Sequence, residues 1–198
     1  MLNMKKGSKV QNADKLSEGY KIEEYGFTAN VNVEKIEPIV RHFIELHNEP
    51  MFFILELPTN LDDETQVRPG VLETTHRDIY YIDGCSKEAA FAILDIDSEL
   101  LINDGISDFG FGCHESYDEI MVGKYNVLTI YSRTPEAYNG FFEKYGINQV
   151  NELVTAWDTF TEEAPGVSKR VAVNGQTIYD IPDKYKEWGI YKAEVREK

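Results

Sequence analysis

The sequence is short of cysteine and of long apolar runs, and each shortage excludes a class of protein. Cys85 and Cys113 are the only two cysteines in 198 residues. They form neither a Cys-x-x-Cys pair nor a disulfide framework, which is typical of small buried thiols in a reducing compartment. The longest apolar stretch, residues 51–57, is far shorter than the roughly 20 residues that a membrane-spanning helix requires. We therefore expect a cytoplasmic protein without membrane contact.

Positive charge is scarce as well. The chain has 20 Lys and Arg residues against 35 Asp and Glu residues, a formal net charge of −15. The first 21 residues hold five lysines and two acidic residues, so the remainder has 15 basic and 33 acidic residues, or −18. A surface of this sign repels phosphate backbones and anionic lipids, so neither nucleic acid nor a membrane is expected as a partner. It favours a basic protein or a metal ion.

The sequence also lacks the motifs that identify common cofactor and catalytic sites. It contains no Gly-x-Ser-x-Gly elbow, no Gly-x-x-x-x-Gly-Lys phosphate loop and no Gly-x-Gly-x-x-Gly turn. His114 and Glu115 begin the His-Glu-x-x-His zinc motif, but Asp118 occupies the position of the second histidine. The acidic run at residues 95–99 lacks the glycine of a calcium-binding loop. No cofactor is therefore predicted.

The densest polar chemistry follows an alternation of glycine and phenylalanine at residues 109–112. Alternate residues of a strand face opposite sides, so Gly110, Gly112 and His114 share one face. Strand glycines indicate that another group approaches the backbone closely. Three carboxylates follow His114 within five residues, those of Glu115, Asp118 and Glu119. Their mutual repulsion favours proton uptake by one of them or a bound cation.

Two functions fit this cluster. The first is an acidic intracellular binding protein that engages a basic protein partner, as an inhibitor or immunity protein does. Its predicted partner-binding residues are His114, Glu115, Tyr117, Asp118, Glu119 and Tyr125. The alternative is a small metal-dependent hydrolase with a catalytic cluster of His114, Glu115, Asp118 and Glu119. A third hypothesis is a homo-oligomer formed through an uncovered sheet edge.

Hydrophobic periodicity predicts a single α+β domain over residues 14–198, with a mixed, mostly antiparallel β-sheet flanked by about four helices. Residues 1–13 are polar and lysine-rich, and we expect a flexible arm there. The predicted helices span residues 14–25, 33–47, 86–94 with an extension to 102, 134–145, and 148–163. Strands are predicted at residues 27–33, 51–57, 78–83, 106–113, 119–132 and 190–195, with a surface loop at 59–70. The apolar stripe of the last helix, which includes Val154 and Trp157, is expected in the core.

Overall fold

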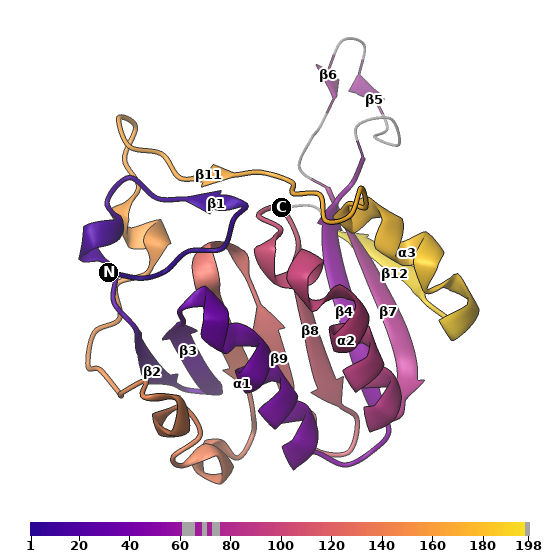
Figure 1. The fold of residues 1–198 in the computed structure, drawn as a ribbon, viewed down its shortest axis with the longest axis horizontal. Coiled ribbons are helices and arrows are strands. Elements are labelled where there is room, and N and C mark those ends of the chain that lie inside the picture. Colours follow the sequence, from indigo (N-terminus) through magenta and orange to yellow (C-terminus); the bar gives the residue numbers. More distant parts are fainter. Residues whose placement is uncertain (61–65, 69–70, 73–75, 197–198) are drawn as a thin grey trace.

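The computed structural model describes residues 1–60, 66–68, 71–72 and 76–196 (Figure 1). Its main feature is an eight-stranded sheet in the order β12-β7-β4-β8-β9-β10-β3-β2, in which all neighbours are antiparallel. The predicted α+β class with a mostly antiparallel sheet is therefore confirmed. The strands are β2 (Gly19–Glu23), β3 (Gly26–Asn30), β4 (Met51–Pro58), β7 (Arg77–Cys85), β8 (Asp108–Cys113), β9 (Glu119–Val122), β10 (Val127–Tyr131) and β12 (Tyr191–Arg196).

Smaller elements complete the fold. Among the described residues there are two two-stranded sheets, β1 (Ser8–Lys9) with β11 (Val167–Ser168) and β5 (Gln66–Arg68) with β6 (Val71–Leu72). Residues 61–65 and 69–70 of the predicted 59–70 loop lie outside the described residues. The described residues also form three α-helices, α1 (Val33–Leu46), α2 (Lys87–Asn103) and α3 (Ile181–Lys184).

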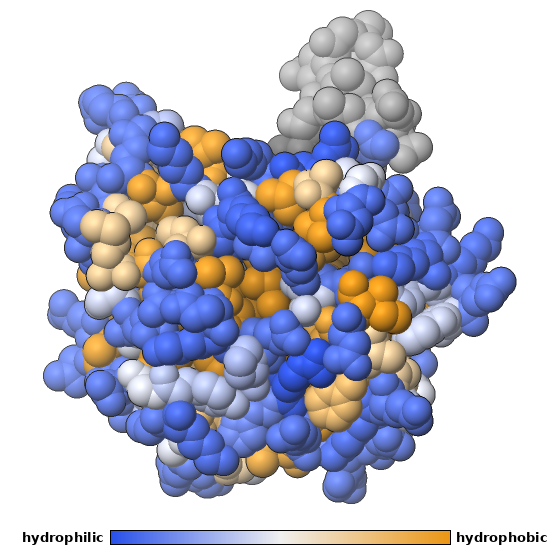
Figure 2. Space-filling view, in the orientation of Figure 1, coloured by the Kyte–Doolittle hydropathy of each residue, from blue (hydrophilic) through white to orange (hydrophobic). Residues whose placement is uncertain are grey.

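Helices α1 and α2, both predicted, lie side by side on one face of the sheet (Figure 1). Ile36, Val40 and Phe43 recur at helical spacing on α1 and are fully buried. The Ser86 hydroxyl caps α2 by accepting a hydrogen bond from the Ala89 amide at 3.1 Å. Figure 2 shows the outer surface of this helical layer, where polar residues predominate and apolar residues are visible between them.

The two faces of the sheet differ because its strands alternate. On β8, Phe109 and Phe111 are fully buried in the core beneath the helices. Gly110 and Gly112 face the other way, where no α-helix of the described residues covers the sheet; we call this side the open face. The predicted close approach to the glycines comes from neighbouring strands, because a side chain at Gly112 would clash with the Phe52 ring. The glycine strip is therefore covered by the protein itself.

Residues 1–13 pack against the body, which contradicts the expected flexible arm. Leu2 and Lys5 are buried, with exposed fractions of 3% and 1%. Ser8 and Lys9 pair with residues of β11. The Lys5 amide donates a hydrogen bond to Asn126 Oδ1 at 3.0 Å. The polar composition of the segment predicted exposure to solvent. Instead, its backbone and side chains form hydrogen bonds with residues distant in the sequence.

Three of the predicted helices are wrong. Residues 14–25 contain β2, which forms a hairpin with β3. In residues 148–163 the backbone pairs instead with β2 and β3, since the Val150 amide donates to the Tyr20 carbonyl at 2.9 Å and Asn30 Nδ2 donates to the Val154 carbonyl at 2.7 Å. Residues 134–145 form two short 3-10 turns, Pro135–Tyr138 and Glu143–Tyr145, separated by Gly140 in a left-handed conformation. In the first two segments, hydrogen bonds to distant strands override the helical spacing of the apolar residues.

One predicted strand is split. Residues 119–132 form β9 and β10, joined by a tight 3-10 turn at Lys124–Asn126 in which Tyr125 and Asn126 have positive φ angles of 56° and 63°. The predicted strand at residues 190–195 is confirmed as β12, which forms one edge of the sheet. The split at residues 124–126 matters for the site because it turns β9 and β10 into an antiparallel pair beneath Trp157.

Candidate functional site

The sheet separates the predicted acidic cluster into two sites. Cys113 and Glu119 end β8 and begin β9, and residues 114–118 form the turn between them. Asp118 turns toward the helical side, where it contacts His47 of the α1 terminus. Glu119 of β9 pairs with Gly112 of β8, so its side chain lies on the open face. The two adjacent carboxylates therefore cannot act in one site.

His114 lies at one end of the open face. Its Nε2 is 2.8 Å from Asp83 Oδ1, and the Tyr191 hydroxyl donates to Asp83 Oδ2 at 2.9 Å. The His114 ring centroid lies 5.1 Å from that of Phe52, and about half of the His114 side chain is exposed. His114 therefore remains available to a partner, but away from Asp118.

The remaining predicted partner-binding residues differ in exposure. Glu115 is exposed and accepts a hydrogen bond from Asn48 Nδ2 at 3.1 Å. Tyr117 is exposed and carries the Arg133 guanidinium 4.5 Å from its ring centroid. Tyr125 is buried, contrary to the predicted contact with a partner, and its ring packs edge-on at 5.0 Å against Trp157. Tyr125 can act only by supporting Trp157.

Asp118 belongs to a buried polar cluster that the sequence did not reveal. His47 Nδ1 donates to the Phe43 carbonyl at 2.7 Å, which leaves Nε2 facing Asp118 Oδ2 at 3.0 Å. That contact requires a proton on the imidazole or on the carboxyl group, because two acceptors repel. The Tyr138 hydroxyl lies 3.0 Å from both atoms. Burial and then the charge of Asp118 raise the pKa of Tyr138, so its hydroxyl stays protonated.

The donors proposed for a metal centre do not meet. His114 bonds Asp83, Glu115 bonds Asn48 and Asp118 bonds His47, while Glu119 lies across the sheet. Within the described ranges, no group of three His, Cys, Asp or Glu side chains could hold a metal ion. The arrangement does not fit a metal-dependent hydrolase built on these four residues.

A groove of about 380 Å³ crosses the open face around Glu119. The Glu119 carboxylate is half-buried, and in the described part of the chain it has no hydrogen-bond or ion-pair partner. Burial, and then the negative charge of Glu56, raise the pKa of Glu119, while Arg196 acts in the opposite direction. The lining combines apolar and aromatic residues with charged ones. It includes Ile54, Tyr81, Met121, Tyr131 and Trp157, the acidic residues Glu56 and Asp108, and the basic residues Lys124 and Arg196.

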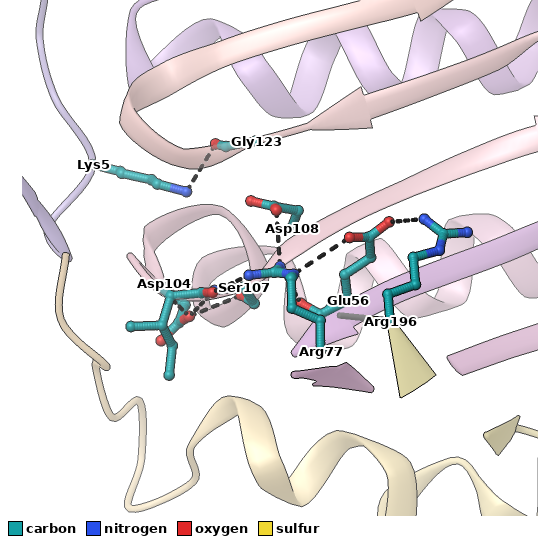
Figure 3. A network of polar contacts seen from close by, with 9 residues as sticks. Lys5, Glu56, Arg77, Asp104, Ser107, Asp108, Gly123 and Arg196 are labelled. Carbon is teal, nitrogen blue, oxygen red and sulfur yellow. Dashed lines mark hydrogen bonds and ion pairs between the residues drawn. The ribbon is translucent and has the colours of Figure 1, made fainter. Parts of the chain in front are cut away.

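The other carboxylates of the groove are already compensated (Figure 3). Arg77, only 5% exposed, donates to Asp108 Oδ2 at 2.8 Å and places Nε 3.4 Å from Glu56 Oε2. Arg196 donates to Glu56 Oε1 at 3.2 Å from the edge strand. Glu56 thus lies between two guanidinium groups. Within the part of the chain that the structure describes, no guanidinium group forms an ion pair with Glu119, although the charge of Arg196 acts on it.

Lys5 approaches the same network from the N-terminal segment (Figure 3). Its ammonium donates to the Gly123 carbonyl at 3.1 Å. Burial lowers the pKa of Lys5 to about 8, against the opposing attraction of Asp108 and Asp104. The bond to Gly123 joins the N-terminal segment to the end of β9, and Lys5 acts on Asp108 and Asp104 through its charge.

Aromatic rings complete the groove. Tyr131 and Trp157 are 55% and 53% exposed, so apolar surface is offered to solvent beside Glu119. Trp157 was expected in the core, but its ring rests on Tyr125 and Phe160 and faces outward. Tyr81 was missed as well, although its alternation with Tyr80 on β7 placed one of the two on each face.

The rest of the chain adds two further findings. Both cysteines are free and buried, as predicted. Over the described residues, none of the helices combines the length and apolarity needed to cross a membrane. No protein family, curated protein or solved structure was found to match this chain.

Proposed function

We propose that this chain is an acidic binding protein that engages a basic protein partner through the open face of its sheet, as an intracellular inhibitor or immunity protein does. The observation that carries the proposal is Glu119, a half-buried carboxylate to which the described residues give no hydrogen bond or ion pair, in a groove lined by Tyr81, Tyr131 and Trp157. A Lys or Arg side chain of the partner provides there the compensation that Arg77 and Arg196 give to Glu56.

Two physical terms favour such a side chain. A hydrogen bond to a charged group contributes about 1.5 to 3 kcal/mol, and a cation over an aromatic face adds roughly 0.5 to 2 kcal/mol. The formal net charge of −15 steers a basic partner toward the protein, so association is fast and weakens as salt is added. His114, at the end of the same face, remains a predicted contact. Asp118 and Tyr125 are buried, so neither belongs to the proposed contact surface.

Calorimetric titration with an eight-residue arginine-rich peptide tests the proposal. We expect binding at about 20 mM salt that weakens at about 150 mM, and no binding of a glutamate-rich peptide of equal length. E119Q should weaken the arginine-rich peptide about tenfold, which is about 1.4 kcal/mol. E163Q removes the same charge from an exposed residue outside the groove and should have little effect. Equal losses in both variants would reduce the interaction to net charge and contradict the site.

A further inference from the structure

A second cavity, of about 330 Å³, lies on the helical side of the sheet where α1 ends. Its lining combines buried residues with an exposed rim. The buried residues are His47, Cys113, Asp118 and Tyr138, and the exposed ones are Leu46, Asn48, Glu115, Thr134 and Ala137. The cavity is therefore reached from solvent and ends at the polar cluster around Asp118.

Asp118 has an unused acceptor. Its exposed fraction is 4%, and Oδ2 is occupied by His47 Nε2 and the Tyr138 hydroxyl, both at 3.0 Å. Oδ1 has almost no solvent-accessible surface, and among the described residues it has no hydrogen-bond partner. Leaving a buried polar atom unpaired typically costs about 1 to 3 kcal/mol, and buried acceptors in folded proteins are normally satisfied. A ligand that donates a hydrogen bond to Oδ1 would recover this cost.

The charge of the lining determines the sign of that ligand. Glu115 and Asp118 are both acidic, and the lining contains no lysine or arginine. The His47 imidazole contacts only one of the two carboxylates, that of Asp118. Leu46 and Ala137 at the rim and the Cys113 thiol below them provide apolar contact for a short chain. The cavity therefore favours a cation attached to an apolar stem.

The geometry of Asp118 selects among cations. A guanidinium group binds a carboxylate best through two parallel hydrogen bonds, one to each oxygen. His47 and Tyr138 already occupy Oδ2, so only one oxygen is free. An ammonium group needs a single acceptor and is compact. The available oxygen therefore suits a primary ammonium better than a guanidinium.

We propose that this cavity is a binding site for a primary ammonium group on a short alkyl chain, with Asp118 Oδ1 as its acceptor and Glu115 at the entrance. The site is independent of the proposed contact with a basic partner, because the sheet separates it from Glu119. The cavity and the groove around Glu119 thus share no lining residue.

Titration of the ¹⁵N-labelled full chain with four probes of equal length, butylammonium, butylguanidinium, butyrate and butanol, tests the proposal. Butylammonium should shift the amide signals of residues 113–118 and 134–138, bind at least fivefold more tightly than butylguanidinium, and leave the open face unchanged. Butyrate and butanol should cause no shifts at the same concentration. Equal binding by butyrate or butanol, tighter binding by butylguanidinium, or no butylammonium shift at about 10 mM would overturn it.

The substitution D118N alters the proposed acceptor directly. If D118N does not fold, two variants at the rim of the cavity test the site instead. E115Q should weaken butylammonium about fivefold, whereas E136Q, an exposed carboxylate on the neighbouring turn that does not line the cavity, should not. A137L fills the entrance from an exposed position and should abolish the shifts. Retained binding in both E115Q and A137L would place the amine elsewhere.

Discussion

The two faces of the same sheet carry different chemistry. On the helical face, Phe53, Phe109 and Phe111 are fully buried in one apolar core. On the open face, β4, β8 and the neighbouring β7 present Glu56, Asp108 and Tyr81 beside a groove. A strand with two-residue alternation thus supplies stability from one side and a polar surface from the other. The comparison indicates that substitutions on the two sides should separate stability from binding.

The largest expected effect is on the helical face. F111A removes a fully buried ring and should lower the free energy of unfolding by about 3 to 5 kcal/mol. Y131A on the open face removes a ring that is 55% exposed and should cost less than about 1 kcal/mol. Urea unfolding of both variants measures the difference. Similar losses would mean that the open face is part of the structural core.

Lys5 gives the next largest effect, and it depends on pH. The folded pKa of Lys5, about 8, lies below the ordinary lysine pKa of 10.5, so between pH 8 and 10.5 the unfolded chain binds more protons and stability rises with pH. From pH 8 to 10.5, the free energy of unfolding of the wild type should therefore rise on the order of 2 to 3 kcal/mol relative to that of K5M. Comparison with K5M cancels the titration of tyrosines. A flat difference would show that the Lys5 ammonium is not desolvated.

A smaller effect concerns Glu119. Because its folded pKa is raised, the charged carboxylate destabilises the fold at neutral pH, and this penalty disappears as the pH falls and the group becomes protonated. E119Q should stabilise the protein by about 0.5 to 1 kcal/mol at pH 7. The advantage should shrink in acid. Chemical unfolding of wild type, E119Q and E163Q at pH 7 and in acid measures this difference in stability. Destabilisation by E119Q alone would mean that Glu119 supports the fold.

The smallest expected change concerns the sheet edges. β12 carries a register shift between Lys192 and Glu194, and a bulge with charged side chains discourages pairing of edge strands. The other edge strand, β2, is partly occupied by residues 148–150. We therefore expect a solution mass near the 22.7 kDa of one chain at tens of micromolar. A mass of two chains would support the homo-oligomer hypothesis.

Much of the fold follows from local patterns in the sequence. The apolar run of β4 and the helical spacing in α1 are strong signals, and the register of β8 follows from its alternation. Residues 148–163 were misassigned because Tyr20 and Asn30, more than a hundred positions away, bond their backbone. No local pattern contains that information.

The site was only partly predictable. The predicted cluster is divided between two faces of the sheet, and alternation alone would have separated Asp118 from Glu119. The pairing of Glu56 with Arg77 and Arg196 depends on β12, β7 and β4 being neighbours, which the sequence does not reveal. The unpartnered state of Glu119 follows from that strand order and could be seen only in three dimensions.

The central claim is that the open face binds a basic partner at Glu119, and side-chain NMR tests it most directly. During titration with the arginine-rich peptide, ring signals of Tyr81, Tyr131 and Trp157 should shift together while those of Phe109 and Phe111 stay unchanged, and E119Q should remove the shifts. Shifts confined to the helical face, or no shift at any ring of the groove, would contradict the account.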